Sequence, residues 1–174
     1  MNPTEIILEN IYTRRSVRRF LLNEIPSQTV EKILRAGMSA PSGWNSQPWE
    51  FIVLTDRKKL SSIASAHEYA HMLNYAPLAI VVCGVLDKVE EAKNFWEQDC
   101  SAASQNILLA THALGLGAVW CGVYPNHDKI NLLRQELNLP PNVVPLNIIA
   151  IGEPEGSGVP LNKWDKNKIH HETW

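Results

Sequence analysis

Eight consecutive residues, Leu78–Val85 with the sequence LAIVVCGV, place the strongest constraint on how this chain can fold. Both the odd and the even positions of the segment are apolar, so a strand formed here must be covered on both of its faces. The segment is also far shorter than the roughly 20 residues that a helix needs to cross a bilayer. We therefore expect a central strand of a buried sheet, and we expect no transmembrane helix.

Capping residues and the spacing of apolar side chains predict the other elements. Helices are expected to begin near five positions: Asn2, Ser27, Asp56, Glu90 and Asn126. The helix from Asp56 is expected to reach about Leu73, and the helix from Glu90 about Leu114. Further strands are predicted at Trp49–Leu54, Ala118–Val123 and Val143–Ile151. A chain of 174 residues is long enough for one substantial core, so residues 1–174 are expected to form a single domain.

The composition argues against several classes of partner. Lys and Arg number 16 and Asp and Glu 18, which gives a net charge of -2 and no global field that favours nucleic acid or an anionic membrane. The first residues lack the uninterrupted apolar run of a signal peptide. Three cysteines without CxxC spacing suit a reducing compartment, where we expect them to be buried thiols. These features favour a cytoplasmic protein.

The densest chemical signal is the basic segment, residues 14–19 with the sequence RRSVRR. Guanidinium groups bind phosphate through paired hydrogen bonds, so four arginines beside Ser16 could hold a phosphorylated ligand. A solvated basic turn is the alternative, and it is the more common fate of an isolated run of charge.

Two further segments have unusual composition. The amide loop, residues 40–49 with the sequence APSGWNSQPW, places amides and hydroxyls between prolines and indoles, and an ordinary turn explains it as well as a ligand site does. Gly115, Gly117 and Gly122 surround a predicted strand and would allow a ligand to approach its backbone closely. Their spacing matches neither a dinucleotide-binding fingerprint nor a phosphate-binding P-loop.

Residues 67–71, HEYAH, match the HExxH pattern of zinc hydrolases, in which two histidines one helical turn apart bind the metal. The match lies on a predicted helix, and Glu90 or Glu91 could in principle supply a third ligand. Three fixed positions in five residues also arise by chance, and the predicted helix face is polar. We therefore expect no metal site, with His67 and His71 on a solvated helix or beside another pocket.

Three segments, RRSVRRF, APSGWNSQPWEFIVL and GLGAVWCGVYP, resemble the nitroreductase family in their order and spacing. The likeness continues through PNVVP, the strand IIAIGEP and the tail KWD. It implies an α+β fold with a mainly antiparallel central sheet flanked by helices, and a C-terminal tail that wraps the partner of a homodimer. It also implies two FMN sites at the dimer interface.

The same resemblance assigns cofactor-binding roles to individual residues. Arg14, Arg15 and Ser16 would approach the ribityl phosphate of FMN, and Arg18 the pyrimidine edge of its ring. Pro41, Ser42 and Asn45 would come from the other subunit, with Gln47 near the ring. The backbone of Trp120, Cys121 and Gly122 would face the reactive N5 side. Lys163 would reach the phosphate from the tail, where Leu161 stands at the position of a second basic residue in the family.

The implied function is that of an FMN-dependent oxidoreductase. NADH or NADPH would pass a hydride to flavin N5 and leave, and an electron-poor small molecule such as a nitroaromatic or a quinone would then be reduced. This ping-pong scheme needs no catalytic side chain, and the sequence shows no nucleophile-elbow pattern. A non-catalytic flavin-binding protein on the same fold is the alternative, with a zinc hydrolase behind it.

Overall fold

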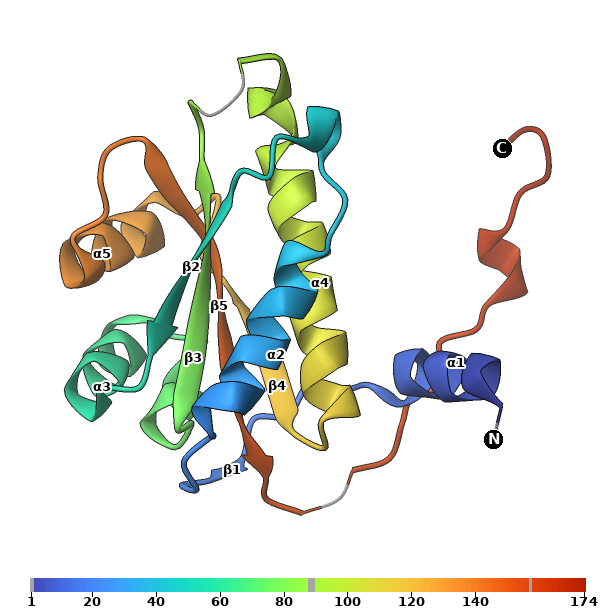
Figure 1. Cartoon of the computed structure of the whole chain (residues 1–174), viewed down its shortest axis with the longest axis horizontal. Helices are drawn as coiled ribbons and strands as arrows, with labels where there is room; N and C mark the ends of the chain where they lie inside the picture. The colour runs from blue at the N-terminus through green and yellow to red at the C-terminus, as the bar shows by residue number, and fades with distance from the viewer. Residues whose placement is uncertain (1, 88–89, 157) are drawn as a thin grey trace.

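A five-stranded antiparallel sheet forms the centre of the body (Figure 1). The computed structural model of the chain describes residues 2–87, 90–156 and 158–174. The longest strand, β5 (Val143–Pro154), pairs with three others: β3 (Leu78–Val85), β4 (Gly117–Gly122) and the short β1 (Phe20–Leu21). The far edge beyond β3 is β2 (Trp49–Leu54). The predicted α+β class with a mainly antiparallel sheet is confirmed.

Strand β3 is central, as its sequence predicts. Its residues from Leu78 to Gly84 are buried, and it pairs with β2 and β5 at once. Ile80 and Val82 belong to the apolar cluster on one face of the sheet, and Val81 and Cys83 to the cluster on the other. Because successive side chains of β3 point to opposite faces of the sheet, the strand contributes to the apolar cluster on each face.

Two pairs of helices cover the two faces. Helices α2 (Ser27–Met38) and α4 (Trp96–Ala113) lie on one face, and α3 (Arg57–Ala66) and α5 (His127–Leu137) on the other (Figure 1). Short 3₁₀ turns connect larger elements at η1 (Gly43–Asn45), η2 (His71–Asn74) and η3 (Glu90–Phe95), and η4 (Lys166–Lys168) lies in the C-terminal tail.

Side-chain caps fix three of the predicted helix starts. The Asn2 side chain accepts a hydrogen bond from Glu5 N, Asp56 from Lys59 N, and Asn126 from Lys129 N, at distances of 2.9, 2.9 and 3.0 Å. The helix start predicted at Ser27 differs by one residue. Pro26 occupies the N-cap position of α2, and Ser27 is the first helical residue.

Other boundaries depart from the predictions. Helix α3 ends at Ala66 and not near Leu73, because His67 adopts an extended backbone and turns its ring toward strand β4. The long helix expected from Glu90 begins as the 3₁₀ turn η3 and becomes α-helical at Trp96. Strand β1 was not predicted, since two residues are too few to show a period.

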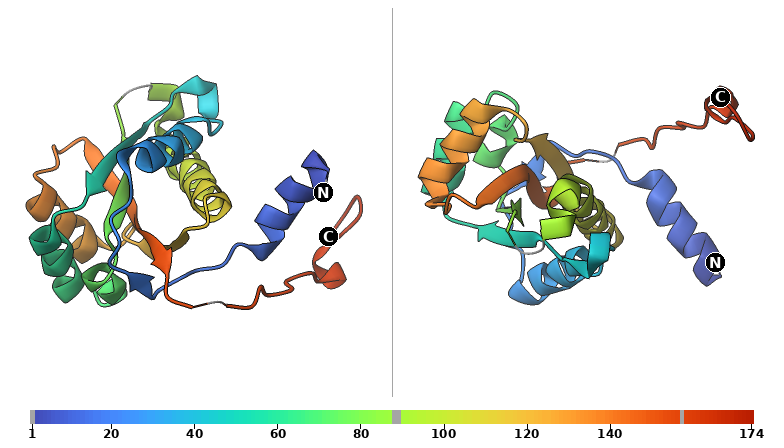
Figure 2. Two further views of the ribbon diagram at one scale, coloured as in Figure 1. Left: turned by 60° about the horizontal axis from the view of Figure 1, so that its bottom comes forward. Right: turned by 90° about the horizontal axis from the view of Figure 1, so that it is seen from above.

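Helix α1 (Pro3–Thr13) and the C-terminal tail, residues 155–174, project from the body (Figure 2). Every residue of α1 is at least partly exposed, including Ile7 at 61%. In the tail, Trp164 is 75% exposed and Trp174 fully exposed, so the expected packing of the tail is not found within one chain. Within the described residues, no helix is long and apolar enough to span a membrane.

Candidate functional site

The basic segment runs beside strand β4. Val17 N donates a hydrogen bond of 2.9 Å to Ala118 O, and Ser16 forms a parallel bridge with Ala118. A Cβ atom on Gly117 would lie 2.7 Å from Val17 Cβ, so only glycine lets the two backbones come this close. The sequence thus fixes the arginines along one edge of the sheet.

Arg14 and Arg15 line a cavity of about 290 Å³ between the end of α1, the end of α4 and the start of the tail. The guanidinium of Arg15 lies against Gly158, where a Cβ atom would be 1.6 Å from Nη1. His112 lines the same cavity. Its pKa is lowered mainly by burial, and the positive charges of Arg14 and Arg15 lower it further. The cavity therefore collects positive charge and suits an anionic group.

The outer edge of β4 exposes main chain where the sequence predicts a cofactor contact. Ala118 O points away from β5, toward Val17 N, so by strand alternation the main-chain groups of Trp120 and Gly122 point outward as well. A Cβ atom on Gly122 would meet nothing within 4 Å. Gly117 is required by internal packing, whereas Gly122 leaves open surface above the backbone.

Cys121 contributes its backbone and not its thiol. The side chain is buried in the apolar cluster beneath α3 and α5, and burial raises the pKa of the thiol to about 11. The charge of Arg18 acts in the opposite direction on this pKa. The basic segment contacts β4 at Ala118, two residues before Trp120, so both segments lie on the same strand edge.

The amide loop is held in an uncommon conformation. Trp44, Asn45 and Gln47 all have left-handed backbones, with φ of 51°, 53° and 46°. Residues other than glycine rarely adopt a positive φ, and they keep it only where surrounding contacts hold the backbone in place. Ser42 Oγ accepts a hydrogen bond of 3.0 Å from Gln47 N, which closes the loop on itself.

Asp99 of α4 anchors this loop from below. Its side chain accepts hydrogen bonds from Gly43 N at 3.0 Å and from Ser46 Oγ at 3.4 Å, and the residue is only 6% exposed. The Trp44 ring packs against Phe95 with 5.5 Å between centroids. Pro41, Asn45 and Gln47 remain exposed on this support.

One chain does not bring all the predicted residues together. The loop around η1 lies at the opposite end of the sheet from the basic segment (Figure 1). Lys163 is exposed on the projecting tail, as is Leu161 at 70%. Within one chain, the arginines and the amide loop are therefore at different ends of the sheet.

Three side chains near these segments were not predicted as site residues: His67, Asp99 and His112. Asp99 carried a signal, because it shares the apolar face of the α4 pattern with Ala103 and Ile107. A carboxylate at such a position needs a buried partner. His112 carried no comparable signal, since its contact with Thr13 Oγ, at 2.9 Å, joins residues far apart in sequence.

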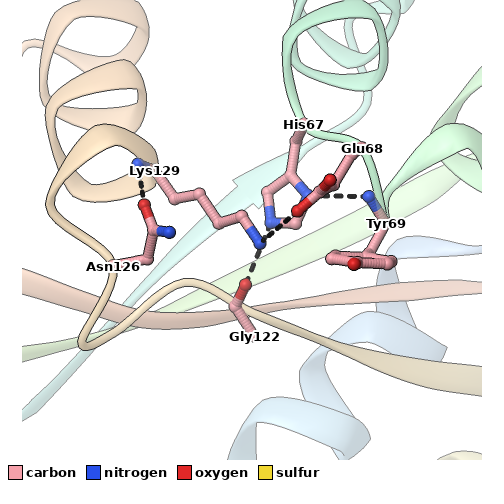
Figure 3. Close-up of polar contacts among 6 residues, drawn as sticks. All are labelled: His67, Glu68, Tyr69, Gly122, Asn126 and Lys129. Atoms are coloured by element: carbon pink, nitrogen blue, oxygen red, sulfur yellow. Dashed lines mark hydrogen bonds and ion pairs between the residues drawn. The ribbon is translucent and has the colours of Figure 1, made fainter.

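The HExxH geometry does not exist in the structure. His67 lies beyond the end of α3 with its ring buried, and His71 begins the separate turn η2, so the two are not one helical turn apart. His67 Nε2 contacts Gly122 O at 3.0 Å (Figure 3). The expectation of a solvated helix is thus wrong for His67, which lies beside the Gly122 edge. Among the described residues, no cluster of three His, Cys, Asp or Glu side chains could hold a metal ion.

Comparisons with known proteins agree with the predicted family. Residues 11–71 and 62–153 match the model of the nitroreductase family. A protein from Methanothermobacter thermautotrophicus, named "Putative NADH dehydrogenase/NAD(P)H nitroreductase", is 44% identical over 168 residues, covering 97% of this chain and 87% of that protein. A protein of the same name from Parabacteroides distasonis has a crystal structure that is 46% identical, with a TM-score of 0.93 over 97% of this chain and 98% of that chain.

An FMN-dependent nitroreductase from Clostridium difficile R20291 is 30% identical, with a TM-score of 0.88 over 96% of this chain and 99% of that chain. These matches cover the basic segment and the sheet, and the family model extends through the strand β5. The chain belongs to the nitroreductase family.

Proposed function

We propose that this protein is an FMN-dependent NAD(P)H oxidoreductase. The observation that carries the proposal is the outer main-chain edge of β4, which starts at the cavity lined by Arg14, Arg15 and Ala118 and ends at the open backbone of Gly122. A flat ring can lie on the edge while its phosphate enters the cavity. The names of the relatives support the donor and the cofactor: one is an NAD(P)H nitroreductase and another is FMN-dependent.

The residues present fit this cofactor in charge and in shape. Two guanidinium groups provide the paired donors that a phosphate dianion takes, and Gly122 leaves the space that any larger residue would fill. The cavity of about 290 Å³ lies at the lower limit of ligand pockets, which range from roughly 300 to 1,000 Å³. It therefore suits the phosphate end of FMN, with the ring outside it.

The residues of the chain would bind and orient the flavin, and the flavin would supply hydride transfer at N5. Arg14 and Arg15 would hold the phosphate. Arg18, one residue after the hydrogen bond from Val17 N to β4, would place positive charge beside the ring and favour the form that carries negative charge. Burial keeps the Cys121 thiol protonated, so it would take no part in the transfer.

The complete site is proposed to form in a homodimer. The amide loop and the arginines of one chain lie at opposite ends of the sheet (Figure 1), which supports a site that takes them from two chains. Helix α1 and the tail expose large apolar side chains, among them Ile6, Tyr12 and Trp164. Apolar surface on this scale is a feature of interfaces, and a second copy would bury it.

We further propose a small electron-poor acceptor, a nitroaromatic or a quinone, reduced after the nicotinamide leaves. A non-catalytic flavin-binding protein on the same fold is the second candidate, because a fold and a cofactor do not establish turnover. A cytoplasmic location is proposed as well, since the three buried free thiols suit a reducing compartment.

Reconstitution followed by anaerobic stopped-flow spectroscopy tests the proposal. The protein should bind FMN, and NADH or NADPH should bleach the flavin absorbance, which a nitroaromatic or a quinone should then restore. If the protein binds FMN but neither NADH nor NADPH bleaches the flavin absorbance, it is a non-catalytic flavin-binding protein. A protein that binds no FMN would contradict both.

A further inference from the structure

The imidazole of His67 is buried between α3, α5 and strand β4 (Figure 3). The residue is only 1% exposed, although it follows directly after the end of a surface helix. Its Nε2 lies 3.0 Å from Gly122 O, and its Nδ1 lies 3.2 Å from Tyr69 N. Both ring nitrogens are thus used by main-chain groups.

These two contacts define one form of the ring. Tyr69 N–H can only donate, so Nδ1 must be the unprotonated acceptor. Gly122 O can only accept, so Nε2 must carry the proton and donate it. Only the neutral ring with its proton on Nε2 satisfies both partners.

Burial and the charge of Lys129 favour the neutral ring, whereas the hydrogen bond to Gly122 O and the charge of Glu68 act in the opposite direction on its pKa. Lys129 Nζ forms an ion pair of 3.5 Å with Glu68 and lies 4.7 Å from the centre of the Tyr69 ring. Burial is the largest of these effects, so the pKa of His67 is lowered overall. Asn126 caps the helix that carries Lys129, so α5 is held against the same corner.

Gly122 is the residue that benefits from a fixed partner. It has no side chain to pack, its Cβ position opens to empty space, and it lies near the end of an edge strand. A glycine in such a place has many accessible backbone conformations. The hydrogen bond from His67 holds its carbonyl, and therefore the peptide plane that follows it, in one orientation.

We propose that His67 is a positioning residue for the flavin ring, which fixes the Gly122 backbone as a preformed platform on the outer edge of β4. The inference rests on the proposed function, because the platform matters only if the ring lies there. It gives the conspicuous HEYAH sequence a role without metal: His67 acts through Gly122, and His71 is not required.

Two substitutions separate positioning from packing. His67→Met fills a similar volume and removes the donor, whereas His67→Gln places an N–H donor at a similar reach. His71→Gln and Ser65→Ala serve as matched controls, since both residues lie within four positions of His67 and neither side chain bonds to Gly122; the Ser65 hydroxyl bonds to Ser61 O of its own helix. FMN affinity, thermal unfolding and the carbonyl ¹³C shift of Gly122 in the FMN-free protein are measured for each variant.

In the wild-type protein, ¹⁵N spectra of the His67 ring at neutral pH should show the neutral form protonated on Nε2. His67→Met should shift the Gly122 carbonyl resonance and weaken FMN binding about tenfold, and His67→Gln should recover most of that loss. The two controls should bind FMN as the wild type does.

Three results would overturn the inference: FMN affinity unchanged in His67→Met, equal losses in His67→Met and His67→Gln, or an unchanged Gly122 resonance in His67→Met. A wild-type protein that binds no FMN would contradict the proposed function, and the inference with it. The Gly122 resonance is measured without flavin, so the two failures can be told apart.

Discussion

Arg14 and Arg18 belong to one basic segment, yet their surroundings differ. Arg14 lines the cavity, whereas Arg18 is exposed and its charge reaches Cys121 on β4. An Arg–phosphate contact contributes on the order of 1.5 to 3 kcal/mol, so Arg14→Ala should weaken FMN binding roughly ten- to a hundredfold. Arg18→Ala should instead lower the flavin midpoint potential, because it removes a cation that favours the reduced form.

Titration with FMN and spectroelectrochemistry on reconstituted proteins distinguish these roles. Arg19→Ala is the matched control, since Arg19 belongs to the same segment and lies outside the cavity that Arg14 lines. If Arg14→Ala leaves the FMN affinity unchanged, Arg14 is only part of a solvated basic turn. The same conclusion holds for Arg18 if Arg18→Ala leaves the flavin midpoint potential unchanged.

The buried ring of His67 makes stability depend on pH. Burial lowers the pKa of His67 in the folded protein, so the unfolded chain takes up a proton at a higher pH than the folded chain does. The free energy of unfolding should therefore fall as the pH drops below about 6.5, the value for an unperturbed histidine. His112 contributes in the same direction, because its pKa is also lowered.

Urea unfolding between pH 7.5 and pH 5 measures this effect. His67→Gln removes one titrating group, so its stability should depend less on pH than that of the wild type, and His112→Gln provides the second comparison. Identical pH profiles for the wild type and His67→Gln would show that the imidazole is not held neutral.

At the scale of elements, the amide loop depends on one carboxylate of α4. Asp99→Ala leaves Gly43 N without its acceptor and frees a loop that holds three left-handed residues. Loss of a buried partner costs about 1 to 3 kcal/mol of unfolding free energy. FMN affinity should fall as well, by roughly tenfold or more on the same energy scale, because the loop no longer keeps its shape.

Thermal unfolding and FMN titration check this prediction. Asp99→Asn keeps an acceptor for Gly43 N and should retain most of the affinity. Ser46→Ala removes only the longer contact of 3.4 Å and should have little effect. Equal FMN affinity in Asp99→Ala and the wild type would exclude Asp99 as the support of a binding loop.

Elements that are determined locally could be predicted from the sequence. Side-chain caps at Asn2, Asp56 and Asn126 act within one turn, and the apolar run of β3 requires cover on both faces wherever it lies. The end of α3 could not be predicted in this way. It is set by Gly122, a residue 55 positions away that accepts the His67 hydrogen bond.

The candidate site also has features that the sequence predicts and features that depend on the tertiary structure. The basic segment bonds to β4 at Ala118, on the strand that carries Trp120–Gly122, while the predicted roles of these residues toward FMN stay predictions. His67 and His112 were missed because each acts through a tertiary contact that the sequence does not reveal, whereas Asp99 could have been found from its place on the apolar face of α4. Roles that depend on a second chain, such as those of the amide loop and Lys163, stay predictions.

For the whole molecule, the projecting tail predicts dependence on a second copy. Removal of residues 155–174 would open the cavity that Gly156 and Gly158 help to line and would delete the apolar side chains of the tail. The truncated protein should aggregate or lose FMN, as measured by light scattering after size exclusion and by flavin content. The milder double variant Trp164→Ser, Trp174→Ser should shift the wild-type dimer toward monomer. A truncated chain that stays a stable monomer with bound flavin would contradict the assembly.

The separation of the amide loop from the basic segment in one chain also has a genetic consequence (Figure 1). If each site takes its arginines from one subunit and its loop from the other, two defective alleles can complement each other. A dimer of one Arg14→Ala chain and one Asp99→Ala chain would gather both lesions in a single site and leave the other intact. The two chains are co-expressed with different affinity tags, and the mixed dimer is purified. It should contain about half of the normal flavin per dimer. If the loop and the arginines of one chain formed a site together, the mixed dimer would contain none.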